Sequence, residues 1–397
     1  MPGSPARQPR WGGVPSRGHA DPRRGISVSS RWGWGPSAIE KMKTTSLTVI
    51  VPGRLETRTG GYEYDRRMIA GLRDRGWRVD VRELDGSFPH PTSAALEHAA
   101  RVLAAIADRT IVLIDGLAFG SLPAEVEREA SRLKIVALVH LPLAAEVGLD
   151  RETAARLALS EQRALAAARR IVVTGKSTVD ALAQYAVARD RIAVVEPGTD
   201  RAPLSRGSTG VPVHLLSVGA ITAGKGHEIL FRALEAIPRR DWRLTCAGSL
   251  ERDPSTVERL RSWLRASGVQ DRISLAGELD GDALELSYDG ADVFVLATLH
   301  ETYCMAVAEA LAHGLPVVST TTGAIPELVG ASGNGGQPAG LLVPPGDVEA
   351  MTAALLTLVG DAGARGQFAE GARRVRDRLP TWNEAADKMA AALNDVS

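Results

Sequence analysis

The sequence is poor in the residues that mark several protein classes. Only two of its 397 residues are cysteines, Cys246 and Cys304, and neither belongs to a CxxC motif or a cluster with histidine. Such isolated cysteines predict reduced thiols and no disulfide framework or zinc site. Aromatic residues make up only 4% of the chain, so Ala, Leu, Val and Ile must fill its cores. That composition suits helices packed on parallel strands more than a β-sandwich.

Net charge and long apolar runs are also missing. Lys and Arg number 47, as do Asp and Glu, so the formal net charge is zero. Domains that bind nucleic acid usually carry a basic excess, so we expect no nucleic-acid partner. No apolar run reaches the roughly 18 residues of a membrane-spanning helix. We therefore expect a cytoplasmic protein.

Residues 1–43 differ from the rest of the chain. They are rich in Arg, Pro, Gly and Ser and lack the apolar centre of a signal peptide. This composition predicts a disordered N-terminal extension, translated upstream of a start at Met42. A basic contact arm is the alternative interpretation.

After Met42, short β-rich runs alternate with helical stretches. The first set of runs predicts strands at 47–51, 110–114, 134–139, 170–173 and 191–195. A segment rich in Pro, Gly and Ser, 196–212, reads as a linker. The alternation then restarts, with strands predicted at 213–218, 242–246, 272–276, 292–296, 316–319 and 340–343.

Alternating strands and helices are typical of an α/β fold with parallel sheets. We predict two doubly wound, Rossmann-like domains, 44–205 and 206–380, followed by a terminal helix within 381–397. At about 100–200 residues per domain, the length also indicates two domains. Ligands of such sheets bind beyond the carboxyl ends of the strands, so the loops that follow strands deserve the closest inspection.

The most informative loop is LHETYCMAVAEALAHGLPVV, residues 299–318. Glu301 precedes a predicted helix, and Glu309 follows eight residues later inside it. The free backbone N–H groups at the start of a helix attract phosphate. A carboxylate on either side of them can accept hydrogen bonds from sugar hydroxyls, so the loop predicts a slot for sugar, diphosphate and ribose. The alternative is a helix with one capping and one solvated glutamate.

A second loop, VGAITAGKGH, covers residues 218–227. Gly219 lets the backbone approach a ligand, and Lys225 supplies a cation where the next helix begins. The pattern is not a P-loop, because Gly226 stands where Ser or Thr is needed, and it is not GxGxxG. A lysine in a glycine-rich turn can also be a plain surface charge.

Two features of the first predicted domain are candidates as well. Gly60 and Gly61 open its first helix, whose N–H groups could face a diphosphate, although a turn that needs positive φ explains the pair equally well. His140 ends the run at 134–139 and could bind or polarise a sugar or acceptor hydroxyl. A purely structural histidine at a strand end is the alternative.

Two further patterns have simpler interpretations. Asp280 and Asp282 form a DxD sequence before a helix, where Asp is a common N-cap, so we expect no metal site there. The first helix carries four arginines that could contact an anionic membrane peripherally. We prefer a solvated helix face, on which those arginines alternate with acids: Arg66, Arg67, Arg73 and Arg75 beside Glu63, Asp65 and Asp74.

Taken together, these loops resemble the retaining glycosyltransferases of family 4 (glycosyl transferases group 1), which have the GT-B fold. The strongest match is Glu-x7-Glu, Glu301 and Glu309, continued by EALAHGLPVVSTTTGAIPELV and AGLLVPPGD. The VGxxxxxKG pattern that contains Lys225 and the PGTD of 197–200 agree with it. The resemblance covers nearly all of residues 44–397.

The resemblance implies a role for each candidate residue. Lys225, beside Gly219, would neutralise the donor diphosphate, which Gly60 and Gly61 would approach from the first domain. Glu309 would bind the ribose, and Glu301 the transferred sugar. The backbone at Tyr303, Cys304 and Met305 would contact the sugar and the phosphate. His140 would lie near the reacting sugar, and the loop that ends with Leu279 would contact the nucleotide base.

Two residues depart from the family pattern. The family usually has Arg after Gly219, where this chain has Ala220, so one cation near the diphosphate is missing unless Arg54 or Arg58 replaces it. The family commonly has Gly after the aromatic residue, where this chain has Cys304. That side chain would either narrow the sugar pocket or point away from it.

The resemblance implies a glycosyltransferase that moves a hexose-type sugar from a nucleotide diphosphate sugar to an acceptor hydroxyl, with retention and with neither a metal ion nor a cofactor. The acceptor is open between a lipid, a small metabolite and a growing glycan. The alternatives are a nucleotide-sugar 2-epimerase, which needs no acceptor, and a non-catalytic partner protein that binds sugar nucleotides.

Overall fold

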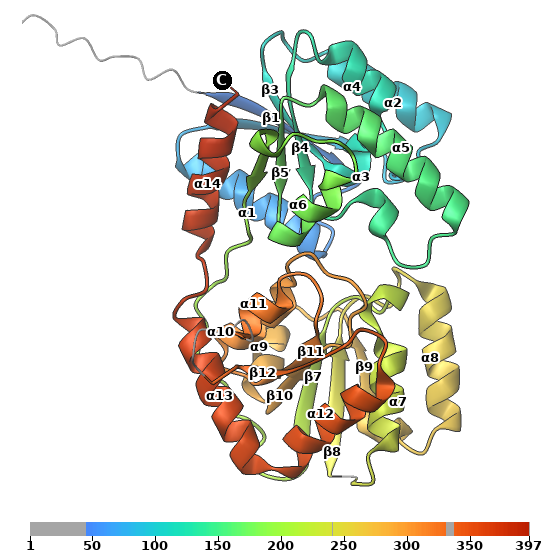
Figure 1. The fold of residues 1–397 in the computed structure, drawn as a ribbon, viewed down its shortest axis with the longest axis vertical. Helices are drawn as coiled ribbons and strands as arrows, with labels where there is room; N and C mark the ends of the chain where they lie inside the picture. The colour runs from blue at the N-terminus through green and yellow to red at the C-terminus, as the bar shows by residue number, and fades with distance from the viewer. Residues whose placement is uncertain (1–44, 240, 331–336, 397) are drawn as a thin grey trace, which may run out of the picture. The chain divides into compact units, whose positions relative to one another are not determined.

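The first half of the chain forms a parallel sheet with the strand order β2-β1-β3-β4-β5-β6 (Figure 1). The computed structural model describes residues 45–239, 241–330 and 337–396, so the predicted extension 1–43 lies outside the described residues. The strands are β1 Ser46–Pro52, β2 Arg78–Leu84, β3 Ile111–Asp115, β4 Lys134–Val139, β5 Arg170–Val173 and β6 Ile192–Val194.

Strand β2 is the one strand of this sheet that our sequence analysis missed. Its sequence RVDVREL alternates polar and apolar residues, and only Val79 and Leu84 are buried. The neighbouring strand β1 is buried along nearly its whole length, as strands covered on both faces are. An edge strand with one solvent-facing side carries a weaker apolar signal, so a search for apolar runs passes over it.

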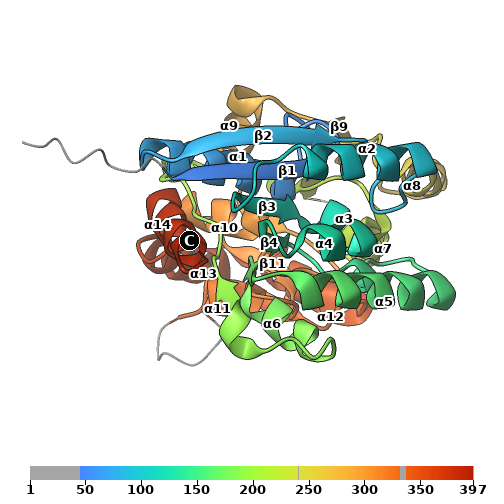
Figure 2. The same cartoon turned by 90° about the horizontal axis from the view of Figure 1, so that it is seen from above.

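Helices cover both faces of the first sheet. One face packs on α2, α4, α5 and α6, and the other on α1 and α14. In Figure 2, α14 lies on one side of the sheet, and α4 and α5 lie on the other. The helices of this half are α1 Gly60–Asp74, α2 Ser93–Ala104, α3 Gly116–Phe119, α4 Pro123–Glu129, α5 Arg151–Ala167 and α6 Lys176–Ala183. Successive strand residues, such as Val112 and Leu113, point to opposite faces and so enter the two different cores.

The second sheet repeats this plan, with the order β12-β11-β10-β7-β8-β9 and parallel pairing. Its strands are β7 Val213–Val218, β8 Trp242–Ala247, β9 Ile273–Gly277, β10 Val293–Val295, β11 Val317–Thr320 and β12 Gly340–Val343. The prediction of two doubly wound, Rossmann-like sheets is confirmed.

The faces of the second sheet are covered by two further groups of helices. Helices α7, α8 and α12 pack on one face, and α9, α10, α11 and α13 on the other. Their bounds are α7 His227–Ala236, α8 Pro254–Ala266, α9 Gly281–Asp289, α10 Met305–Ala312, α11 Ile325–Val329, α12 Val348–Gly360 and α13 Ala362–Arg376. None of the helices in the described part of the chain combines the length and apolar character needed to cross a bilayer.

The last helix, α14 Trp382–Asn394, belongs to the core of the first sheet. Thr381 and Glu384 cap its start reciprocally, and Ala385 and Met389 pack among residues of β1 and α1. The linker between the sheets runs beside the start of this helix, because the Thr199 N–H donates to the Pro380 carbonyl over 2.8 Å. The domain boundaries themselves stay predictions.

The close packing of α1 on α14 can be tested by a substitution at their contact. A methyl group at Gly71 would lie 2.6 Å from Cβ of Ala386, well inside van der Waals contact. We expect Gly71→Ala to destabilise the fold by about 1–3 kcal/mol through overpacking, although Ala is intrinsically better than Gly in a helix.

Urea unfolding of a double-mutant cycle with Ala386→Gly measures this contact. In the Ala386→Gly background the added methyl group has room, so Gly71→Ala should become neutral or stabilising. Equal effects of Gly71→Ala in both backgrounds would show that α14 does not pack on α1 in this way.

Candidate functional site

Lys225 and Glu301, which the sequence singled out in separate loops, contact each other. Lys225 Nζ lies 2.5 Å from Glu301 Oε1, and the Thr298 hydroxyl donates to the same oxygen over 3.0 Å. The aliphatic part of Lys225 passes over Gly219, with Cε 3.6 Å from where a Cβ would stand. An ammonium group has three donors, so two of them remain for a ligand.

The backbone around Lys225 is fixed by the glycine that follows it. Gly226 has φ +65°, and a Cβ there would lie 2.0 Å from the Ala297 carbonyl oxygen, so no other residue fits. Burial lowers the pKa of Lys225, but the charge of Glu301 outweighs burial and the pKa is raised overall. The ammonium group therefore stays charged at neutral pH.

Helix α10 begins beside this ion pair. Its N-cap residue, Cys304, has φ +78°, and its side chain is buried in the apolar core with Tyr303. Within the described residues, the backbone N–H groups of Cys304, Met305 and Ala306 have no acceptor. Three free N–H groups at a helix N-terminus next to a lysine form a favourable place for an anion.

The second glutamate of the pattern, Glu309, lies in the second turn of α10. Its Oε2 accepts a hydrogen bond of 3.0 Å from the Tyr288 hydroxyl, and the Tyr288 ring stacks on His313 with centroids 4.5 Å apart. Burial raises the pKa of Glu309 to about 7. Its carboxyl group is thus poised to change charge near neutral pH.

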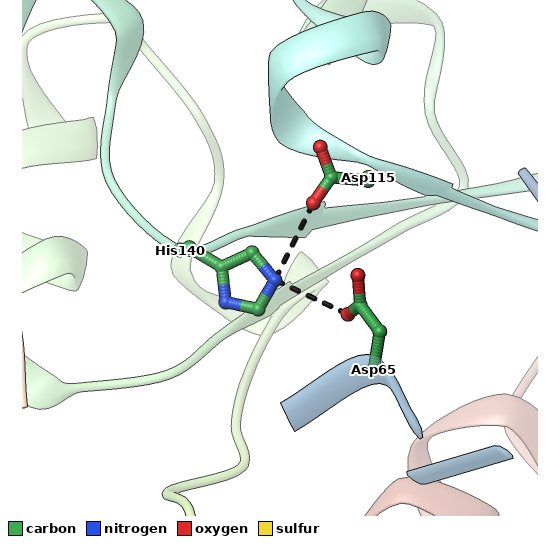
Figure 3. A group of neighbouring side chains, drawn as sticks. All are labelled: Asp65, Asp115 and His140. Carbon is green, nitrogen blue, oxygen red and sulfur yellow. Dashed lines mark hydrogen bonds and ion pairs between the residues drawn. The ribbon is translucent and has the colours of Figure 1, made fainter. Parts of the chain in front are cut away.

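His140 directly follows β4, and one nitrogen of its ring faces two buried carboxylates (Figure 3). Its Nε2 is 3.2 Å from Asp65 Oδ1 and 3.4 Å from Asp115 Oδ2. Burial lowers the pKa of His140, but the charges and hydrogen bonds of the two aspartates outweigh burial and raise it to about 10. Burial raises the pKa of Asp65, against the opposing effect of His140.

The sequence did not single out either aspartate as a site residue. The prediction that Asp65 lies on a solvated helix face is wrong, because the Asp65 side chain is only 1% exposed. Two signals pointed to them. Asp65 follows Gly61 by about one helical turn and so shares its face of α1, and Asp115 ends β3, the strand next to β4.

The arginines of α1 pair within the chain. Arg66 and Arg67 both contact Glu63, and Arg75 contacts Asp387 of α14. These ion pairs give α1 mixed charges, whereas the buried Asp65 departs from the solvated face that the sequence predicted.

The remaining candidate residues lie in neighbouring loops. A Cβ at Gly61 would be 3.5 Å from Cδ2 of His140, and one at Gly60 would be 3.9 Å from Sδ of Met305. Arg58 donates to the Leu279 carbonyl over 3.1 Å, whereas Arg54 lies 3.8 Å from Glu56. Arg58 therefore reaches the loop where the resemblance places the nucleotide base.

Two sets of ionisable side chains are relevant to metal binding: the DxD sequence and a cluster of two aspartates with His140. Asp280 of the DxD pattern caps α9 by accepting from the Ala283 N–H over 2.9 Å, which confirms the N-cap interpretation. Asp65, Asp115 and His140 have donor atoms within 4.8 Å of one another, close enough to surround a cation. In this arrangement, however, the ring nitrogen of His140 serves as the donor to both carboxylates.

The positive φ of Cys304 generates a stability prediction. A side chain in the left-handed region costs about 1–2 kcal/mol, and Gly avoids this cost. We expect Cys304→Gly to be more stable than Cys304→Ala by about 1 kcal/mol in urea unfolding.

Cys246 in strand β8 supplies the matched control, because it is buried like Cys304 but is not among the residues with positive φ. There the order should reverse, with Gly less stable than Ala by roughly 0.5–1 kcal/mol. The same order at both positions would contradict the strained conformation of Cys304.

Comparison with known proteins connects this geometry to a family. Residues 212–361 match the family model of glycosyl transferases group 1. D-inositol 3-phosphate glycosyltransferase of Xylanimonas cellulosilytica is 31% identical over 60% of this chain and 58% of its own length. MMP alpha-(1->4)-mannosyltransferase of Mycolicibacterium hassiacum is 26% identical over 79% of this chain and 78% of its own. The chain thus spans somewhat over half the length of the first of these relatives.

Solved structures agree on the fold. A sucrose-phosphate synthase from Thermosynechococcus elongatus superposes with a TM-score of 0.75 at 19% identity, over 89% of this chain and 99% of that one. Anabaena HepE in complex with UDP-glucose gives 0.68 at 16% identity, over 88% and 99%. Both parallel sheets therefore follow the GT-B arrangement, and residues 212–361 are similar to the glycosyl transferases group 1.

Proposed function

We propose that this protein is a retaining glycosyltransferase that moves a hexose-type sugar from a nucleotide diphosphate sugar to an acceptor hydroxyl without a metal ion. The observation that carries the proposal is the Lys225–Glu301 pair beside the free N–H groups of α10, inside the segment that matches the family. The relatives are named as glycosyltransferases, and HepE was solved with UDP-glucose, which supports a nucleotide sugar as donor.

Charge stabilisation of the leaving group is the central step of this proposal. The diphosphate gains negative charge as the glycosidic bond breaks, and preorganised donors stabilise such charge most effectively in a site that excludes water. Lys225 would contribute its two remaining donors, and the N-terminus of α10 would contribute backbone N–H groups. Because both elements are fixed before the reaction, little reorganisation is needed when the bond breaks.

Recognition of the donor would divide between the two glutamates. Glu301 is held by Lys225 and Thr298, so it presents a fixed carboxylate to sugar hydroxyls. Glu309 is held by Tyr288 and would accept hydrogen bonds from the ribose. The acceptor hydroxyl would attack from the face that the diphosphate leaves, which retains the anomeric configuration.

Lys225→Gln tests the proposed leaving-group role. Glutamine keeps an amide donor for Glu301 but removes the charge, so we expect kcat of transfer to fall about 10²-fold or more. Lys388→Ala, which removes an exposed lysine of α14, is the matched control and should retain full activity. Wild-type protein with UDP-, GDP- or ADP-sugars would be assayed by NMR of the products.

The same spectra separate the possible activities. A new glycoside of the donor's own anomeric configuration, formed only with an acceptor, supports the proposal. An inverted product contradicts retention, an isomerised donor without acceptor indicates an epimerase, and binding without turnover indicates a non-catalytic partner protein. Unchanged kcat in Lys225→Gln would remove that lysine from the mechanism.

The raised pKa of Glu309 predicts how nucleotide affinity depends on pH. Since its folded pKa is about 7, the carboxyl group becomes ionised between about pH 6 and 8. Hydrogen bonds from ribose hydroxyls to an ionised carboxylate are stronger than to a neutral one. Affinity for the nucleotide diphosphate should therefore rise several-fold over this range.

Isothermal titration of wild type and Glu309→Gln with the same nucleotide checks the prediction. The ratio of the two dissociation constants removes the titration of the nucleotide itself, and this ratio should change with pH. A ratio that stays constant from pH 6 to 8 would mean that Glu309 does not meet the ribose as an ionised group.

A further inference from the structure

Three ionisable side chains gather at the carboxyl edge of the first sheet, each from a different element. Asp65 comes from α1, Asp115 from the end of β3, and His140 from the residue after β4 (Figure 3). The carboxyl groups of the aspartates are 1% and 5% exposed, whereas the His140 side chain is 22% exposed. The carboxylates thus lie beneath a histidine that reaches the surface of the site.

Both carboxylates approach the same atom of the ring, Nε2 of His140. Nδ1 points away from both of them in Figure 3, and within the described residues it has no hydrogen-bond partner. With Nε2 used by the protein, Nδ1 is the ring nitrogen that remains for a ligand. A positively charged ring donates from both nitrogens, whereas a neutral ring with its proton on Nε2 would offer Nδ1 only as an acceptor.

The two aspartates are themselves firmly held. Asp115 uses its Oδ1 to accept from the Leu117 N–H over 2.9 Å, which leaves Oδ2 for His140. Asp65 directs Oδ1 to His140, and its buried Oδ2 has no partner among the described residues. Two buried carboxylates against one nitrogen favour the charged ring, because loss of the Nδ1 proton would leave their negative charge without the positive charge that compensates it.

Among the residues that the structure describes, no cationic side chain contacts the His140 ring. Tyr64 packs edge-on against His140 with centroids 5.3 Å apart, and its hydroxyl donates to Val195. The Tyr62 hydroxyl donates to the Pro52 carbonyl. Arg66, the nearby cation on α1, is paired with Glu63.

We propose that Asp65 and Asp115 are positioning residues that keep His140 as an imidazolium, so that its Nδ1–H is a permanent hydrogen-bond donor to an oxygen of the bound nucleotide sugar. The ligand part of this inference rests on the proposed transferase function. Gly61, at the N-terminus of α1, lies against the Cδ2–Nε2 edge of the same ring: a Cβ there would stand 3.5 Å from Cδ2 and 3.7 Å from Nε2, so this glycine does not cover Nδ1.

The inference has a consequence for pH dependence. In wild type, His140 donates across the whole range from pH 6 to 9, because its pKa is about 10. Asp65→Asn or Asp115→Asn removes one charge from beside the ring and lowers that pKa. The Nδ1–H donor is then lost as pH rises. If the reaction requires this donor, kcat/KM falls by about tenfold per pH unit above the new pKa.

Imidazole 15N NMR of the free protein tests the charge state without any substrate. The spectra of wild type, Asp65→Asn, Asp115→Asn and Asp74→Asn would be followed from pH 5.5 to 9, and His140→Gln would assign the resonance. We expect His140 to stay protonated throughout in wild type and in Asp74→Asn, whose exposed acid lies on the same helix. In at least one of the other two variants it should titrate within this range.

Several results would overturn the proposal. Titration of His140 near pH 6.5 in wild type would show that the carboxylates do not hold its proton. A shift of its resonance on addition of Zn²⁺, or broadening by Mn²⁺, would indicate a cation site instead. Two aspartate variants with cooperative melting but an unchanged wild-type resonance would equally exclude the positioning role.

The kinetic arm separates this inference from the proposed function. If wild type transfers sugar, kcat/KM of the variant in which His140 titrates should fall with rising pH, relative to wild type and Asp74→Asn. A parallel profile in all three proteins would overturn the positioning role while transferase activity stands. If wild type transfers no sugar, the proposed function fails, and with it the donor role, while the NMR result still decides whether Asp65 and Asp115 hold the charge.

Discussion

Parallel pairing of every strand in both sheets is the constraint from which the site follows. Since neighbouring strands run in the same direction, the loops that leave their carboxyl ends all emerge at one edge of each sheet. Residues distant in the chain then become neighbours, as with Lys225 and Glu301, or Asp65 and His140. The helices that follow these loops add their N-termini to the same edge, which supplies N–H donors without any special side chain.

Charge at this edge is present mostly as pairs that are partly or wholly removed from water. Each such pair loses hydration, and removal of one partner leaves the other buried and uncompensated. Lys225 with Glu301, and His140 with Asp65 and Asp115, are therefore rigid as well as charged. Such buried ion pairs contribute less to stability than apolar residues of similar size would.

Sequence patterns predicted the fold because buried parallel strands leave a clear record. Runs such as 134–139 and 170–173 coincide with β4 and β5, since a strand covered on both faces is apolar throughout. Strand β2 escaped because an edge strand alternates. The contact between Lys225 and Glu301 could not be predicted, because the strand order that brings their loops together is a property of the whole sheet.

Burial of Asp65 escaped prediction for a different reason. A charged residue in a helix rich in arginine is expected to be solvated. The burial of Asp65 becomes favourable because His140, which follows β4, pairs with its carboxyl group. Cys304 shows the same limit, because its positive φ follows from the loop that leads into α10. For Asp65 the local sequence predicted a solvated side chain, and the tertiary surroundings decided otherwise.

The place of α14 has a consequence for how the chain folds while it is being synthesised. Part of the core of the first sheet consists of α14 residues, such as Met389 and Leu393. Val194 ends the last strand of that sheet and Trp382 begins α14, so the 187 residues of 195–381 lie between them. At about 5–20 residues per second, a ribosome needs roughly 10–40 s to add them. For that time the first sheet has its strands but lacks one covering helix, so its exposed apolar face is a surface that chaperones can bind.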